Sequence, residues 1–93
     1  MSQATATVQI DNERVAVTEW RFAPGAETGW HCHQYDYVVV PQSSGRLLLK
    51  TKGGDSVSEL VSGKSYFRKA GVEHNVVNAN TGEFVFIEIE LKT

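Results

Sequence analysis

The chain has 93 residues, 41% of them hydrophobic and 22% charged, which is enough for one small core and too little for a catalytic domain plus a separate binding domain. The formal net charge is -2 at pH 7, and basic residues are scattered among acidic ones, so no basic stripe is available for nucleic acid. No apolar run approaches the length of a membrane span, and residues 1–7 lack the basic flank and apolar core of a signal peptide. We therefore expect one domain spanning residues 1–93, a cytoplasmic location, and neither nucleic acid nor membrane as a partner.

Short extended segments separated by turns follow one another along the chain. Residues 1–7 are expected to be a flexible N-terminus, with the core running from about residue 8 to residue 91. The segments 15–22, 46–50 and 84–91 have the length and composition of strands. No segment carries a helical period over an ordinary helix length, so the sequence predicts an all-β sandwich or barrel. The turn residues lie at Asp11-Asn12, Pro24-Gly25, Ser43-Ser44-Gly45, Gly53-Gly54-Asp55, Ser62-Gly63, Ala70-Gly71 and Asn80-Thr81-Gly82.

The segment 84–91 shows the clearest two-residue period of a strand. One face carries Val85, Ile87, Ile89 and Leu91. The other face carries Phe84, Phe86, Glu88 and Glu90. This mixed face leaves two interpretations of Glu88 open: an acid or base inside the barrel, or an exposed carboxylate.

Three histidines, His31, His33 and His74, are the whole histidine content of the chain. In a strand, His31 and His33 project to the same face and are close enough to share one ion, while Cys32 points the other way. A His-x-His pair alone is a weak signal, because such pairs are often only hydrogen-bonded or solvent-facing. Cys32 is the single cysteine, so it forms no internal disulfide, in agreement with a reducing compartment.

The residues around these histidines resemble the two motifs of the cupin family. Gly25, five residues and then His31-Cys32-His33 are similar to the first motif. The second motif is matched at every spacing by Gly63, Gly71, His74 and Asn78, with Lys69 in place of the usual proline. The resemblance extends from about residue 15 to residue 91 and implies a small cupin barrel of the double-stranded β-helix, or jelly-roll, type. More loosely, the chain looks like bacterial cupins associated with β-alanine degradation.

The resemblance implies one divalent transition metal held by His31, His33 and His74. The family's usual carboxylate ligand falls at Tyr37, and the acidic Asp36 is displaced by one position, which in a strand turns it to the opposite face. Three sites remain open: three histidines plus water, a site that Asp36 joins through a bulge, or a site with Tyr37 as fourth ligand. We prefer the first, with Tyr37 orienting the substrate; the alternative is that Tyr37 fills the barrel, as we expect of other aromatic residues such as Trp30 and Phe67.

Imidazole ligands suit iron, zinc, nickel, manganese or copper, so the ligand set does not identify the metal. We expect a metal-dependent enzyme acting on a small metabolite with a carboxylate or carbonyl group, with Tyr37 and Arg68 as candidate catalytic residues. Arg68 lies within the second motif, and an arginine binds a carboxylate with two hydrogen bonds. Three-histidine cupins include iron-dependent dioxygenases, which makes a dioxygenase-type reaction one expectation. The alternatives are a non-catalytic binding or sensing module and a purely structural metal; small cupins commonly pair, so we expect a homodimer.

Overall fold

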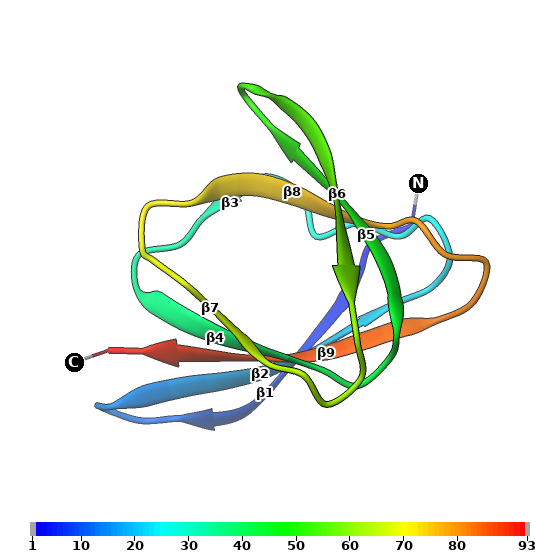
Figure 1. Cartoon of the computed structure of the whole chain (residues 1–93). Coiled ribbons are helices and arrows are strands. Elements are labelled where there is room, and N and C mark those ends of the chain that lie inside the picture. The colour runs from blue at the N-terminus through cyan, green and yellow to red at the C-terminus, as the bar shows by residue number, and fades with distance from the viewer. Residues whose placement is uncertain (1, 93) are drawn as a thin grey trace.

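The structure is a computed structural model that describes residues 2–92 and consists of β-strands joined by turns and loops (Figure 1). The described residues contain no helix that could span a membrane. Every regular element of the described residues is a strand, which confirms the all-β prediction. The strands are β1 (Thr5–Asp11), β2 (Val15–Phe22), β3 (His31–Cys32), β4 (Asp36–Pro41), β5 (Gly45–Thr51), β6 (Gly54–Leu60), β7 (Tyr66–Arg68), β8 (Glu73–Asn78) and β9 (Phe84–Leu91).

Two antiparallel sheets face each other (Figure 1). One has the strand order β1-β2-β9-β4-β7 and the other β3-β8-β5-β6. Most neighbours within each sheet are distant in the sequence, as β9 between β2 and β4 shows. This arrangement is the double-stranded jelly-roll barrel that the motifs imply, and it places side chains from both sheets in one interior.

A compact apolar core fills one end of the barrel. Phe22 and Phe84 are fully buried there, opposite each other in the β2–β9 register. Leu47 of β5 closes the core from the second sheet. Because β2, β9 and β5 are anchored at this end, the opposite end is free to carry polar interior residues.

The folded core begins at an earlier residue of the N-terminal segment than the sequence indicated. Ala4 is buried in the core, and its amide donates a hydrogen bond to the Glu27 carbonyl at 2.9 Å. β1 begins at Thr5 and pairs with β2 from that residue onward. The core therefore starts at Ala4 rather than near residue 8, because backbone pairing holds a segment whose side chains are mostly polar. Met1 lies outside the described residues.

The interior face of β9 is the mixed one that carries Phe84, Phe86 and Glu88, not the uniformly apolar one. Glu88 is buried within the barrel, so its exposed alternative is wrong. The apolar Ile87 and Ile89 are only half-buried on the outer face. The expectation of barrel-filling aromatic residues also fails at Trp30 and Phe67, which are 56% and 49% exposed.

Asn78, the last residue of the second motif, connects two loops, the one that follows β2 and the one between β8 and β9. Its buried side-chain amide donates hydrogen bonds to the carbonyls of Phe22, Ala23 and Gly82 at 2.9–3.2 Å. Its Oδ1 accepts a hydrogen bond from the Asn80 amide at 2.9 Å. One side chain thus satisfies backbone groups that would otherwise be buried without partners.

We predict that Asn78→Ala lowers the free energy of unfolding by about 3 kcal/mol, because several buried carbonyls lose their donor. Asn78→Asp should be at least as damaging, since a carboxylate keeps the shape but offers these carbonyls no donor. Urea denaturation would measure both variants, with the exposed Gln9→Ala as the control. A loss below about 1 kcal/mol in both would show that the loops are held in other ways.

Candidate metal centre

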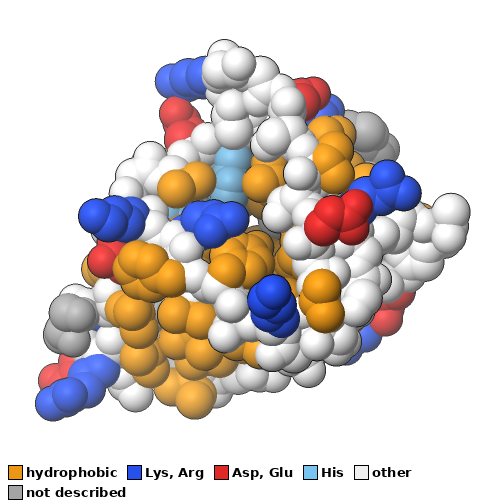
Figure 2. Space-filling view, in the orientation of Figure 1, with side chains coloured by type: hydrophobic (Ala, Val, Ile, Leu, Met, Phe, Trp, Pro, Cys, Tyr) orange, Lys and Arg blue, Asp and Glu red, His pale blue; other side chains and the backbone are white. Residues whose placement is uncertain are grey.

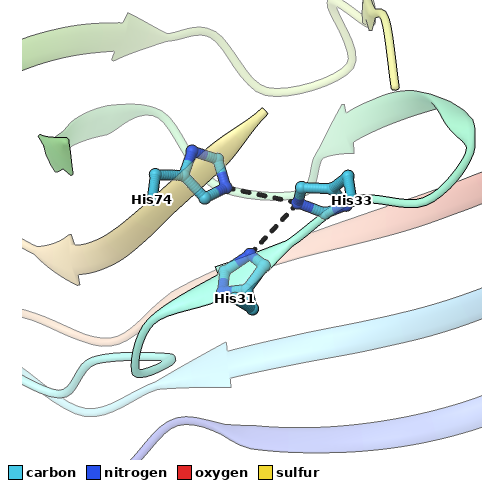
Figure 3. A group of neighbouring side chains, drawn as sticks. All are labelled: His31, His33 and His74. Carbon is cyan, nitrogen blue, oxygen red and sulfur yellow. Dashed lines mark hydrogen bonds between the residues drawn. The ribbon is translucent and has the colours of Figure 1, made fainter. Parts of the chain in front are cut away.

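The three histidines converge on one point although they come from separate segments (Figure 3). His31 lies on β3 directly opposite His74 on β8, and His33 follows β3. The Nε2 atom of His33 is 3.1 Å from that of His31 and 3.2 Å from that of His74. Ligand nitrogens about 2.1 Å from a common ion lie at about this separation from one another. The geometry therefore fits one ion held by three imidazoles.

Strand alternation separates Cys32 from its neighbours as the sequence predicted. Cys32 is exposed, whereas His33 is buried. The pairing with the second motif continues past the end of β3: the His33 amide donates to the Val72 carbonyl at 2.9 Å, and the Gly71 amide donates to the His33 carbonyl at 2.8 Å. The two motifs are thus held together by backbone hydrogen bonds on either side of His33.

A hydrogen bond selects the tautomer of His31. Its Nδ1 lies 2.9 Å from the Gly29 carbonyl oxygen, which only accepts, so Nδ1 carries the proton and Nε2 presents a lone pair to the centre. The Gly29 amide in turn donates to Oδ1 of Asn75 at 2.9 Å, and the Asn75 amide donates to Glu27 at 3.0 Å. Asn75 could not be assigned this role from the sequence, in which its position beside His74 in the second motif is the only signal.

Burial keeps the other two histidines neutral. Loss of solvent, together with the charge of the neighbouring His31, lowers the pKa of His33 and of His74 to about 4. Neutral imidazole is the form that binds a metal ion. The donor set is therefore ready to bind a divalent cation at neutral pH.

Asp36 and Tyr37 take opposite sides of β4. Asp36 is exposed, and its Oδ1 accepts a hydrogen bond from the Ala70 amide at 2.8 Å, so the alternative in which a bulge brings Asp36 to the metal is wrong. Tyr37 is buried with its ring stacked on His33, 3.9 Å between centroids. Burial and the negative charge of Glu88 raise the pKa of Tyr37 above its usual value, so the phenol keeps its proton. Tyr37 is thus a neutral neighbour of the histidines.

A cavity of about 140 Å³ opens beside the histidines. Figure 2 shows histidine at the bottom of a hollow whose rim carries apolar and basic side chains. Arg68 lies at this cavity with its guanidinium 4.4 Å from the ring centre of Tyr66. The lining combines the three histidines with mostly aromatic and aliphatic side chains: Trp20, Tyr37, Val39, Leu47, Leu49, Tyr66, Val72, Val76 and Phe86, together with Thr28, Thr51, Arg68 and Glu88.

Glu88 introduces a carboxylate that motif spacing did not locate. It projects from β9 into the cavity, and its Oε2 is 3.9 Å from Nε2 of His33. Burial, followed by the charge of Glu90, raises the pKa of Glu88 to about 7. The indole N–H of Trp20 lies close enough to favour the ionised form of Glu88, yet it has no hydrogen-bond partner of good geometry.

We predict an acid-sensitive stability for the metal-free protein. Between pH 6.5 and about 4 the unfolded chain binds protons that folded His33 and His74 exclude, so the free energy of unfolding decreases as the pH falls through this range. Glu88 opposes this between pH 4.5 and about 7, because its folded form holds a proton that the unfolded chain releases. Glu88→Gln should therefore steepen the acid destabilisation by up to about 1.4 kcal/mol per pH unit.

Urea denaturation between pH 4.5 and 6.5 in the presence of a chelator would measure these slopes, with the exposed Glu13→Gln as control. Parallel slopes for wild type and Glu88→Gln would mean that Glu88 has the same pKa in the folded and unfolded protein.

Comparison with known proteins agrees with this fold. The model of the family described as "Cupin domain" matches residues 18–90. The chain is 64% identical over 90 residues to the "Beta-alanine degradation protein BauB" of Pseudomonas aeruginosa, covering 97% of this chain and 95% of the relative.

Solved structures show the same architecture. A cupin domain from Bordetella pertussis superposes with a TM-score of 0.97 at 62% identity, covering 99% of this chain and 96% of the other. A Klebsiella pneumoniae protein with a double-stranded β-helix domain has the same fold, with a TM-score of 0.79 at 22% identity over 97% of this chain and 77% of the other. The chain belongs to the cupin family.

Proposed function

We propose that this protein is a metal-dependent enzyme that binds one divalent transition-metal ion through His31, His33 and His74 and acts on a small metabolite with a carboxylate or carbonyl group. The observation that carries the proposal is the convergence of three Nε2 atoms beside a cavity that is open to solvent. The name of the Pseudomonas aeruginosa relative, a β-alanine degradation protein, supports a role among the small acids of β-alanine degradation.

The chemistry expected of the site follows from its neutral ligands. Bound to three uncharged imidazoles, iron, zinc, nickel, manganese or copper would keep its full double charge to polarise a carbonyl or acidify a water. Tyr37 offers a protonated hydroxyl as a hydrogen-bond donor within the same cavity. Arg68 at the cavity offers a planar guanidinium for a substrate carboxylate. A dioxygenase-type reaction belongs to this proposal if the resident metal is iron.

The open cavity separates this proposal from a purely structural metal. Structural sites are closed by protein ligands, whereas this cluster offers three histidines beside a solvent-connected space. A sensing module would have the same geometry, so ligand binding without turnover is the result that would favour it. The exposed free thiol of Cys32 supports the cytoplasmic location that we propose.

Replacing any of the three histidines with alanine should weaken zinc binding by at least about 100-fold, because the site loses a third of its protein ligands. Competition with a chromophoric chelator would measure the affinity, and elemental analysis of untagged protein would identify the resident metal. Cys32→Ser is the matched control from the same segment and should bind zinc like the wild type. Stoichiometric metal in the triple alanine variant would contradict the proposed site.

A measurement of product formation tests the proposal that the protein is an enzyme. Protein loaded with its resident metal would be incubated with small amino, hydroxy and oxo acids, and products would be followed by mass spectrometry together with oxygen consumption. If these acids bound but no product formed, the result would favour a sensing module over an enzyme.

We also propose that two copies pair through the outer face of the larger sheet. The registers place one apolar residue of each strand in a row across this face: Ile10, Val17, Ile89, Val38 and Phe67. Figure 2 shows apolar side chains gathered on the side of the molecule where Figure 1 places β4 and β9. A flat apolar sheet face fits a second copy of the same face, because two sheets pack face to face about 10 Å apart.

Phe67→Glu should convert the dimer to a monomer, because it introduces a charge into the row without disturbing a buried residue. Light scattering after size exclusion should give twice the 10.3 kDa of one chain for the wild type and 10.3 kDa for the variant. Val57→Glu on the other sheet is a matched exposed control and should stay dimeric. A monomeric wild type, or dissociation only by Val57→Glu, would contradict this interface.

A further inference from the structure

Two side chains of opposite charge line the same cavity without pairing with each other. Arg68 lies on β7 and Glu88 on β9, with β4 between them in the sheet. The registers place Arg68 in the row of Tyr37 and Glu88 in the next row, that of Val39. Two strand spacings separate their backbones by about 10 Å. The charges thus lie on opposite sides of the space above β4.

Most of the hydrogen-bonding capacity of Arg68 is unused. Its guanidinium stacks on the Tyr66 ring, and one nitrogen donates to the Phe67 carbonyl at 3.1 Å. Within residues 2–92, no carboxylate lies within ion-pair distance of Arg68. A guanidinium has five donor hydrogens, so the remaining ones are available to a carboxylate that enters the cavity.

At the opposite side, two buried polar groups are without full partners. The Glu88 side chain is only 10% exposed, and its Oε2 lies 3.9 Å from Nε2 of the neutral His33. The indole N–H of Trp20, on the neighbouring strand β2, lines the same cavity with no hydrogen-bond partner among the described residues. Buried groups of this kind are rarely left unpaired in a folded protein. A ligand hydroxyl would satisfy both, because it donates to the carboxylate and accepts from the indole N–H, whereas an ammonium group would satisfy Glu88 alone.

Glu88 is better placed to hold a ligand than to join the ring of metal ligands. The three histidines lie within 4.8 Å of one another, and Glu88 forms a cluster of that size with His33 and Glu90 but not with the three histidines together. The Glu88 carboxylate therefore lies beside the group of three histidines, on the side that faces the cavity.

We propose that the cavity binds a short dipolar acid end to end, with the carboxylate at Arg68 and an amino or hydroxyl group at Glu88, where a hydroxyl would also accept a hydrogen bond from Trp20. This inference rests on the proposed function and specifies its substrate class: small acids with a hydrogen-bond donor at the far end of a short carbon chain. Tyr37, which stacks on His33, lies on the strand between the two anchors. The middle of a ligand held at both ends therefore passes beside the histidines, where the chemistry would take place.

Calorimetric titration of zinc-loaded protein with three acids of equal carbon number tests the end-to-end arrangement. The probes are 3-aminopropanoate, 3-hydroxypropanoate and propanoate. The first two should bind at least about tenfold more tightly than propanoate, the factor expected of one hydrogen bond to a charged group. Glu88→Gln should remove most of this preference for 3-aminopropanoate. Arg68→Gln should weaken the binding of all three acids.

Glu13→Gln, which removes an exposed carboxylate that does not line the cavity, is the control and should retain the preference. Equal affinities of wild type for 3-aminopropanoate and propanoate would overturn the proposal, as would a loss of zinc in Glu88→Gln, which would make Glu88 a metal ligand. Elemental analysis before each titration distinguishes a failure of the proposed function from a failure of the end-to-end binding. Protein that holds no metal would contradict the proposed function. The same titrations on metal-free protein would still decide whether Arg68 and Glu88 bind the two ends of the acid.

Discussion

The antiparallel pairing of β3 with β8 is the interaction on which the whole site depends. It places His31 opposite His74 and extends through the backbone hydrogen bonds between His33 and the turn before β8. Two segments about 40 residues apart thereby bring three imidazoles together, and no single element contains the centre. The hydrogen bond from His31 to Gly29 then points its free nitrogen inward. Loss of this pairing would scatter the ligands even if each strand remained intact.

The histidines could be found from the sequence because local backbone rules determine their spacing. Gly63 and Gly71 of the second motif adopt positive φ angles, which other residues rarely do, so these glycines mark turns at fixed distances from His74. Alternation within a strand likewise separated Cys32 from its neighbours. By contrast, the proximity of Glu88 to His33 depends on the pairing of β9 with β4, and no local pattern reveals which distant strands pair.

The interior of the barrel could not be predicted from hydrophobicity alone. Period-two alternation shows that β9 has two faces but not which of them is inside. The more apolar face, with Ile87 and Ile89, is outside, while Glu88 is inside. A domain with a solvent-connected cavity must place polar groups in its interior, and the cost of burying them is tolerated because the Phe22 and Phe84 end of the barrel supplies the apolar core. Functional residues are thus the ones for which hydrophobic patterning fails.

The resemblance to the first cupin motif implies a carboxylate at position 37, where this chain has Tyr37, and Glu88 provides a physical reason for the difference. The charge of Glu88 already raises the pKa of Tyr37, so a second buried carboxylate at position 37 would be costly to ionise. Tyr37 instead contributes a neutral ring that supports His33 by stacking. The single negative charge of the cavity wall then comes from the neighbouring strand, outside the ring of histidines. The space next to the three nitrogens is left open, and polarity across the cavity is set by Glu88 on one side and Arg68 on the other.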